Sequence, residues 1–280
     1  MRFVLRALVL ATLAAAPIAA RALDLDLGAA SAYSGFFFGN ASSLQDVEGR
    51  LAVGGDLSIH GTSIGGRLPT TSTQASLIVG GNVAAFDSGS IWAGSQHNSF
   101  GVYRGSKAAK VPSYLDLRQG SLDLDFEAER TYLFSLSDAV ANQAPTGRVT
   151  VLYSTVTLSG SNDPNLEVFN LTASQVRSGM NFALANIKSS AYLVLNVAAD
   201  AQRSVQMGIS MDVFNGRHSK VLFNLPDARI LNFTGVRVYG SVLAPAACVC
   251  NSSGHLEGTI VADTWDSGME IGYTPFVPKH

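Results

Sequence analysis

Short apolar runs separated by glycine-rich turns recur along most of the chain. In the first third, runs at 51–53, 57–59 and 77–79 are bounded by Gly-Gly pairs, Asp or Asn. Runs of this length with turn residues at their ends predict brief β-strands joined by tight turns. Glycine permits the corner of a coil and the apolar run fills a narrow core, so the pattern predicts a β-solenoid.

The C-terminal third repeats this pattern most regularly. Apolar runs at 221–226, 230–233 and 235–240 lead into two similar glycine phrases, VYGSVLA at 238–244 and LEGTIVA at 256–262. Gly240 and Gly258 of these two phrases lie closer together in the sequence than Gly54 and Gly80 of the first third do. We therefore expect successive coils of unequal length.

A helical pattern interrupts the strands over residues 123–144. Apolar residues recur there at intervals of three, four and seven, at Phe126, Leu133, Leu136 and Val140. Charged residues lie between them, so the segment predicts an amphipathic helix that buries one stripe against the β-body. Asp123 or Asp125 can cap its start, and Pro145 with Gly147 ends it.

Strands resume after the helix. They are predicted at 149–153, 156–158, 166–171, 182–187 and 192–197, with a helical turn at 172–178. The chain is therefore mainly β, and we predict a right-handed parallel β-helix (β-solenoid) with one long α-helix packed alongside.

An aromatic triplet, Phe36, Phe37 and Phe38, lies close to the start of the first predicted coils. The terminal coils of a solenoid need a cap, so we expect the triplet to fill or plug the open end of the core. The alternative is an exposed binding patch, but side chains of this size are more often buried.

The N-terminal segment has the features of a secretory signal. Arg2 and Arg6 precede an apolar run at 7–20, and Ala-Arg-Ala at 20–22 matches a small-x-small cleavage site. This predicts a signal peptide at 1–22, an exported chain, and a single domain over 23–280, a length that solenoids reach undivided. No later stretch has the ~20 uninterrupted apolar residues of a membrane span.

The composition excludes one class of partner. Charged residues make up 14% of the chain and the formal net charge is −2. Nucleic-acid binding requires a basic field, which this balance does not supply, so we expect no nucleic-acid partner.

Several of these motifs together resemble one known family. They are DVEGRLAVGG at 46–55, FNLP at 223–226, GSVLAP at 240–245, EGTI at 257–260, and the terminal Glu270 and Phe276. The ordered set resembles the choice-of-anchor A domain, a secreted bacterial surface domain of adhesin type related to β-solenoids. The resemblance runs from about Leu25 to Pro278. It implies a surface-binding domain and carries over no catalytic residue.

An enzyme is the main alternative, because β-helices often carry polysaccharide lyases and hydrolases that need clustered carboxylates. The best-placed acids are Asp263, Asp266 and Glu270, followed by Asp212 and Glu257. Trp265 lies among the first three and offers a ring on which a sugar can stack. Spacings of three and four residues in a turn-rich segment fix no geometry, however, so solvated acids at a solenoid edge are the simpler interpretation.

The two cysteines of the chain, Cys248 and Cys250, would point to the same face of a strand. A disulfide between them closes a very small ring and adds little stability. A redox pair and half of a metal site are alternatives to two small buried or oxidised residues. We favour the last, because no further cysteine or histidine cluster completes a zinc set.

Other candidate ligands are scattered. The histidines are His60, His97, His218, His255 and His280, each without a partner at ligand spacing. Asn162, Asp163 and Asn165 could form a calcium loop, but a proline-containing turn explains them equally well. The sequence therefore predicts no metal and no cofactor.

Asparagines have two candidate roles. We expect three of them to lie at coil corners and hydrogen-bond to the neighbouring coil: Asn224, Asn232 and Asn251. Four begin Asn-x-Ser/Thr sequons, which matter only if the secreting cell glycosylates them: Asn40, Asn170, Asn232 and Asn251.

The function predicted is a secreted, non-enzymatic, adhesin-like binding or structural domain at the cell surface. Its partner is expected to be an extracellular glycan or matrix surface, which many weak contacts would hold through multivalency. Ice binding is a further alternative, since solenoids can present flat rows of threonine. The threonine clusters do not repeat from coil to coil, which disfavours it: Thr70, Thr71, Thr73, Thr155 and Thr157.

Overall fold

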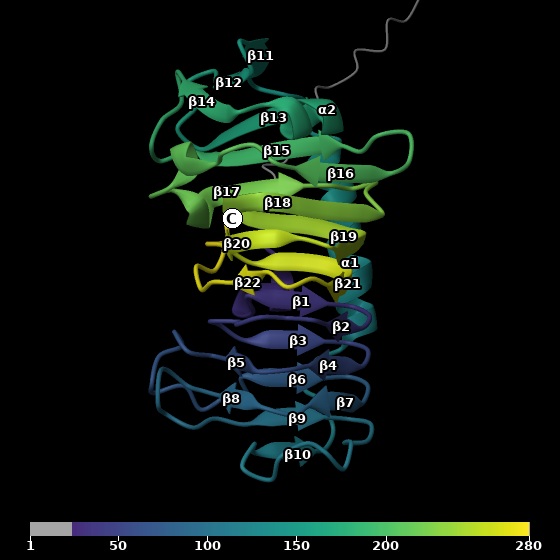
Figure 1. Cartoon of the computed structure of the whole chain (residues 1–280). Coiled ribbons are helices and arrows are strands. Elements are labelled where there is room, and N and C mark those ends of the chain that lie inside the picture. The colour runs from purple at the N-terminus through teal and green to yellow at the C-terminus, as the bar shows by residue number, and fades with distance from the viewer. Residues whose placement is uncertain (1–23, 280) are drawn as a thin grey trace, which may run out of the picture.

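The fold is a stack of short coils, seen from the side in Figure 1. The structure is a computed structural model that describes residues 24–279. The predicted signal peptide at 1–22 and His280 lie outside the described residues. β11 and β12 pair antiparallel, while the other paired strands are parallel, which is how successive coils stack.

The strands of the coils lie on three faces of the stack. The first face contains β1 (Gly35–Phe37), β3 (Leu51–Val53), β6 (Leu77–Val79), β9 (Gly101–Tyr103), β10 (Leu117–Gln119), β13 (Leu166–Thr172), β15 (Tyr192–Ala198) and β17 (Val221–Asn224). The second contains β2 (Ala41–Ser42), β4 (Leu57–Ile59), β7 (Val83–Phe86) and β16 (Ser204–Met207). The third contains β5 (Thr62–Ile64), β8 (Gly89–Ile91), β20 (Ser253–Glu257) and β22 (Glu270–Ile271).

Three long strands turn a corner and serve two faces: β18 (Ile230–Tyr239), β19 (Ser241–Cys250) and β21 (Ile260–Asp266). One end of the stack carries β11 (Arg148–Leu152), β12 (Thr155–Ser159) and β14 (Asn181–Ala185). The helices are α1 (Phe126–Ala141) and α2 (Ala173–Ser178), with short 3-10 turns at Gly28–Ala32, Asp212–Phe214 and His218–Lys220. The strands and the helical turn predicted after α1 are thus confirmed with shifts of one or two residues.

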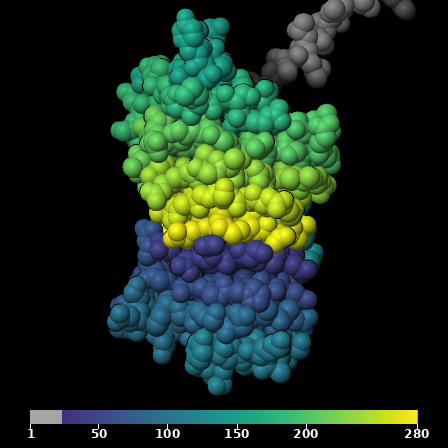
Figure 2. Space-filling model, in the orientation of Figure 1, coloured from purple at the N-terminus to yellow at the C-terminus, as the bar shows by residue number. Residues whose placement is uncertain are grey.

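The coils do not follow one another in chain order. β1 pairs with β3 on one edge and with β21 on the other, so that Phe36 lies between Ala52 and Val261. Figure 2 shows the purple first coils directly against the yellow last coils. The chain coils from β1 to β10 at one end, passes along the stack through α1, and coils back from the other end to β21.

The cap predicted for the aromatic triplet is therefore wrong, because β1 lies in the middle of the stack. The burial that was predicted is confirmed: Phe36 and Phe37 are fully buried and Phe38 is 6% exposed. The position differs because β21, which comes from the opposite end of the chain, covers the edge of β1 that would otherwise be open.

α1 packs on the first face. Apolar side chains on the outer side of that face, such as Val194, Leu222 and Val261, form one buried cluster with Leu133, Leu136 and Val140. At ~1.5 Å per residue, the 16 residues of α1 span about 24 Å, or about five strand spacings. The helix is therefore long enough to cover the coils between β15 and β1.

The helix begins later than the first predicted residue. The Asp125 side chain accepts hydrogen bonds from the backbone N–H groups of Glu127 and Ala128, both at 3.1 Å, and so caps α1. Asn142 closes the other end, before Pro145. Of the two caps predicted, Asp125 is the one used.

Hydrogen-bonded asparagines join neighbouring coils beneath α1. The Asn224 amide donates to Asn196 Oδ1 at 2.9 Å, and the Asn196 amide donates to Asn170 Oδ1 at 3.2 Å. The Ser137 hydroxyl of α1 donates to Asn224 Oδ1 at 2.6 Å, which ties the helix to this ladder. The Asn232 amide likewise donates to the Asn251 carbonyl at 2.6 Å, so the bonding predicted for Asn224 and Asn232 is confirmed.

The glycine phrases mark corners where coils approach most closely. A Cβ atom on Gly80 would collide with the Gly54 carbonyl oxygen, and one on Gly258 would collide with the Gly240 carbonyl oxygen. The interval from Gly54 to Gly80 and the shorter one from Gly240 to Gly258 are thus one turn of the coil each. Glycine is required there because the backbone of the adjacent coil fills the space of a side chain.

Replacement of Gly80 by alanine is expected to lower the free energy of unfolding by about 2 to 4 kcal/mol, because the coil must shift to relieve the collision. Urea unfolding of the two proteins measures this difference. Gly66→Ala is the matched control, since a Cβ there has no atom within 4 Å. Equal losses in the two variants would contradict the close approach of coils at Gly80.

Candidate functional site

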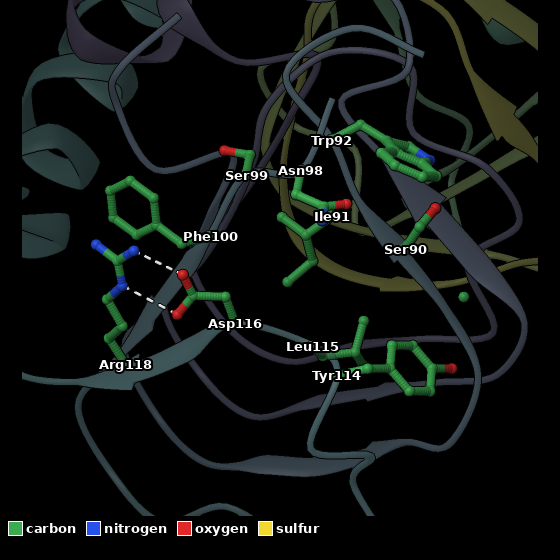
Figure 3. Close-up of a pocket in the computed structure, with 11 residues that line it drawn as sticks. Ser90, Ile91, Trp92, Asn98, Ser99, Phe100, Tyr114, Leu115, Asp116 and Arg118 are labelled. Carbon is green, nitrogen blue, oxygen red and sulfur yellow. Dashed lines mark hydrogen bonds and ion pairs between the residues drawn. The ribbon is translucent and has the colours of Figure 1, made fainter. Parts of the chain in front are cut away.

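A cavity of about 410 Å³ opens at the end of the stack that carries β8, β9 and β10. It lies where the third face turns into the first, and Figure 3 shows its lining. Side chains from three successive segments of the chain meet there: Ser90 and Trp92 from the first, Asn98 and Phe100 from the second, Tyr114 and Asp116 from the third.

A short hairpin between β8 and β9 holds the upper margin of this cavity. Trp92 and Asn98 form an antiparallel bridge, and the Ala93 N–H donates to the His97 carbonyl at 2.7 Å. The fully buried Ser76 hydroxyl lies 2.6 Å from the Trp92 carbonyl, a hydrogen bond that fixes the base of the hairpin. The Trp92 backbone is therefore held by the coil above it.

Two aromatic side chains lie at opposite margins of the cavity, Trp92 above and Tyr114 below, with Ser90 and Ile91 between them (Figure 3). Tyr114 is 67% exposed, so its ring is accessible to a ligand. Trp92 also lines a neighbouring cavity of about 370 Å³, together with Asp46, Ser63 and others. Trp92 is thus common to the linings of both cavities.

A charged pair, Asp116 and Arg118, borders the cavity beside Phe100 (Figure 3). Arg118 on β10 donates to Asp116 through Nε at 3.0 Å and Nη2 at 2.6 Å. These bonds from Arg118 hold the pKa of the Asp116 carboxyl below its usual value, so it stays ionised at neutral pH. The Arg118 guanidinium also stacks over the Phe100 ring at 3.9 Å.

The arrangement suits a ligand with both apolar faces and hydroxyl edges. Binding pockets of a few hundred Å³ typically combine aromatic walls with a few placed polar groups. Trp92 and Tyr114 supply the walls, while Asp116, Asn98 and Ser90 supply acceptors and donors. Asp116 is the carboxylate in this lining, and Arg118 already engages it, so the cavity offers no second acid for paired acid–base work.

The acids favoured by the sequence for catalysis do not line this cavity. Asp263 pairs with Arg130 of α1 at 2.8 Å, and Asp266 accepts hydrogen bonds from Ser42 and Ser43 at 2.9 and 3.0 Å. Glu270 lies 3.3 Å from His255. Each carboxylate therefore has a separate structural partner.

Trp265 offers no platform for a sugar. It is 1% exposed, its ring centroid lies 5.3 Å from that of Phe37, and its indole N–H donates to the Ser267 carbonyl at 2.8 Å. The stacking role considered from the sequence is wrong, because this residue points into the core. Asp212 lies at a 3-10 turn, where its carboxylate accepts from the Ser210 hydroxyl at 3.0 Å.

Glu257 belongs to a charged network on the third face. His255 Nε2 lies 3.0 Å from Glu257 Oε1, and Arg67 Nη1 lies 3.1 Å from the same oxygen. Arg67 also pairs with Glu48 at 2.7 Å. Since Arg67 and Glu48 belong to the first coils and Glu257 to the last, this network links the two parts of the chain that meet at β1 and β21.

Neighbouring groups set the charge state of Glu257. Burial raises the pKa of this carboxyl, but hydrogen bonds from His255 and Thr274, with the charge of Arg67, outweigh burial. The pKa of Glu257 therefore lies below its usual value. A carboxylate with this shift stabilises the folded chain at neutral pH and loses that contribution as pH falls through its folded pKa.

The other residues considered as metal ligands have structural roles or lie far from one another. Cys248 and Cys250 form a disulfide on the second face, consistent with the oxidised pair favoured from the sequence. Asp163 accepts from the backbone N–H groups of Asn165 and Leu166 at 2.7 and 3.2 Å, which is a turn closed on itself. Within residues 24–279, no group of three or more His, Cys, Asp or Glu could hold a metal ion.

The histidines lie in separate surroundings. His60 pairs with Asp87 at 2.8 Å on the surface, and His218 packs against the Tyr239 ring. His97 belongs to the hairpin that borders the cavity.

The predicted threonine clusters lie in different parts of the structure. Thr155 and Thr157 belong to β12, whereas 70–73 lie in the loop between β5 and β6. The outward positions of the second face carry unlike side chains, in the order Gln206, Asn232, Cys250, Asp266, Ser42 and Ser58. These positions form no repeating threonine row.

None of Trp92, Tyr114, Asp116 and Arg118 was predicted from the sequence to line a site. Asp116 and Arg118 are two residues apart, and alternate residues of a strand point to one side, which is a signal for their pairing. Nothing local signals that Tyr114 and Trp92 line the same cavity, because this depends on how successive coils stack.

A family profile described as "Putative Ice-binding-like adhesive domain" matches residues 26–273. The match spans most of the chain, and the chain belongs to this family. It is therefore an adhesin-like domain, as its motifs suggested. Comparison with curated protein sequences gives no match.

Three ice-binding proteins are among the solved structures that are similar. One from the Antarctic ascomycete Antarctomyces psychrotrophicus has 15% identity and a TM-score of 0.37, covering 89% of this chain and 97% of that chain. One from an Antarctic biological consortium has 13% identity and a TM-score of 0.38, covering 98% and 97%. A glycosylated one from an Arctic yeast has 13% identity and a TM-score of 0.38, covering 92% and 97%.

No helix in residues 24–279 has the length and apolar character needed to cross a membrane.

Replacement of Glu257 by glutamine is expected to lower the free energy of unfolding at pH 7 by about 1 to 3 kcal/mol, because three charged or polar partners lose a carboxylate. The difference from wild type should shrink as pH falls through the lowered pKa of Glu257, where the wild-type carboxylate also protonates. Urea unfolding at pH 7 and pH 3 measures both values.

Glu127→Gln, at an exposed position in the first turn of α1, is the matched control and should cost less at pH 7, about 0.3 to 1 kcal/mol, because its carboxylate only favours the helix N-terminus. A stability difference for Glu257→Gln that stays constant from pH 7 to pH 3 would rule out the role given to its charge.

Proposed function

We propose that this chain is an exported, non-enzymatic adhesive domain that binds extracellular carbohydrate in the cavity between Trp92 and Tyr114. Family membership supports the adhesive class. The choice of carbohydrate rests on one observation: two aromatic rings on opposite margins of a cavity that also contains Asn98, Ser90 and Asp116. Sugar rings present apolar C–H faces to aromatic rings and hydroxyl groups to polar side chains.

The position of Trp92 supports binding of more than one sugar unit. Trp92 lines both this cavity and the neighbouring one, where Asp46 and Ser63 supply further polar groups. A chain of sugars passing across Trp92 would use both cavities at once. Several weak contacts along a repetitive polymer gain strength by effective concentration, which suits adhesion to a glycan-coated surface.

The finer features predicted from the sequence belong to the same proposal. They are a choice-of-anchor A type of domain, a right-handed sense of coiling, cleavage of a signal peptide after residue 22, one domain over 23–280, and release to the cell surface or beyond. The motif set and the apolar N-terminal run support them.

A glycan array with the chain from residue 23 identifies the ligand, and titration of the best glycan tests the site. Trp92→Ala and Tyr114→Ala should each weaken binding about tenfold or more, because buried aromatic contacts dominate such interfaces. Tyr153→Ala is the matched control: this tyrosine is 91% exposed at the β11–β12 turn, far from the cavity, and should leave binding unchanged.

Urea unfolding of each variant separates loss of the site from loss of the fold. Binding that survives both cavity substitutions in folded protein, or an array with no bound glycan, contradicts the proposal.

A further inference from the structure

The outer side of the first face is not covered along its whole length. α1 packs over β15, β17 and β19, and Val194 and Leu222 belong to one buried cluster with it, which extends to Ala52 on β3. Beyond β3 the same column continues with Ile78 on β6 and Val102 on β9, which are only partly buried. The helix begins at Phe126 and does not reach this part of the face.

A cavity of about 500 Å³ lies over these uncovered residues. Its walls are mainly apolar, with Ile78, Val102, Phe100, Leu122 and Tyr33 among the lining residues. It is separate from the aromatic cavity, which lies on the other side of Phe100 and shares only that residue with it. A space of this size and lining is typical of small-molecule sites.

Arg50 gives this apolar cavity a positive charge. It lines both this cavity and a second one of about 270 Å³, so Arg50 borders two open spaces. Nη2 donates to the Ser72 hydroxyl at 2.8 Å, and Nε is buried without a hydrogen-bond partner. Among residues 24–279, no carboxylate lies within the 4.0 Å of an ion pair with Arg50.

A half-buried guanidinium without a counter-charge is costly, and a ligand anion would offset that cost. The acid in the cavity lining is Asp123, which is exposed in the segment that leads to α1 and does not pair with Arg50. The site therefore offers one cation beside an apolar wall. That combination selects a molecule with an acidic group at one end and an apolar body behind it.

We propose that this cavity binds a carboxylate with a short acyl chain, with the carboxylate on Arg50 and the chain against Ile78 and Val102. The site does not depend on the carbohydrate cavity, and its ligand differs in chemical class. A domain with both sites would bind a glycan-coated surface and sense or carry an acyl acid at the same time.

Calorimetric titration of the chain from residue 23 tests this with octanoate as the probe. Octanoate should bind one to one, and about tenfold or more tighter than either acetate, which lacks the chain, or 1-octanol, which lacks the charge. Arg50→Gln should reduce octanoate affinity to that of 1-octanol, while Arg50→Lys should retain part of it. Arg104→Gln, an exposed arginine outside the cavity lining, is the matched control and should bind as wild type does.

Trp92→Ala should bind octanoate normally, so failure of the carbohydrate proposal and failure of this one give different results. NMR shift changes on adding octanoate should gather at 73–78, 100–102 and 121–124. Octanoate no tighter than 1-octanol, glucuronate tighter than octanoate, or shift changes elsewhere on the chain would each overturn the proposal. The comparison of octanoate, acetate and 1-octanol on the wild-type chain tests the proposal even if Arg50→Gln does not fold.

Discussion

The pairing of the first coil with the last is the constraint on which the rest of the structure depends. Both edges of β1 are paired, one to β3 and one to β21, so neither is left open. The chain coils away from β1 as far as β10. It can return to β1 only after it has passed along the coils that run from β21 to β13 on the other side. α1 makes that passage, and its length of about five strand spacings matches the coils that it covers.

This topology places irregular segments where binding can occur. The middle of the stack is closed by strand pairing, by the Arg67–Glu257 network and by α1. The end at β10 has no further coil to cover it, and the loops there are free to carry exposed rings such as Tyr114. The regular coils support the loops and the part of the first face beyond α1, where the two proposed sites lie.

Local features of the fold could be predicted from the sequence, and long-range ones could not. The Asp125 cap, the helical turn at α2 and the strands around it follow from propensities and spacing within a few residues. The burial of Trp265 against Phe37 depends instead on pairing between strands from opposite ends of the chain, which no local pattern encodes. The cavity could not be predicted for the same reason, because Trp92 and Tyr114 line one cavity only when successive coils stack.

The proposed carbohydrate site lies at the open end of the stack and not on its second face. Hydrogen exchange of the folded chain with and without the best glycan of an array tests it directly. We expect slower exchange at 89–100 and 113–118 in the bound state, with little change in β16, β18 and β19. Protection confined to those strands of the second face would contradict it.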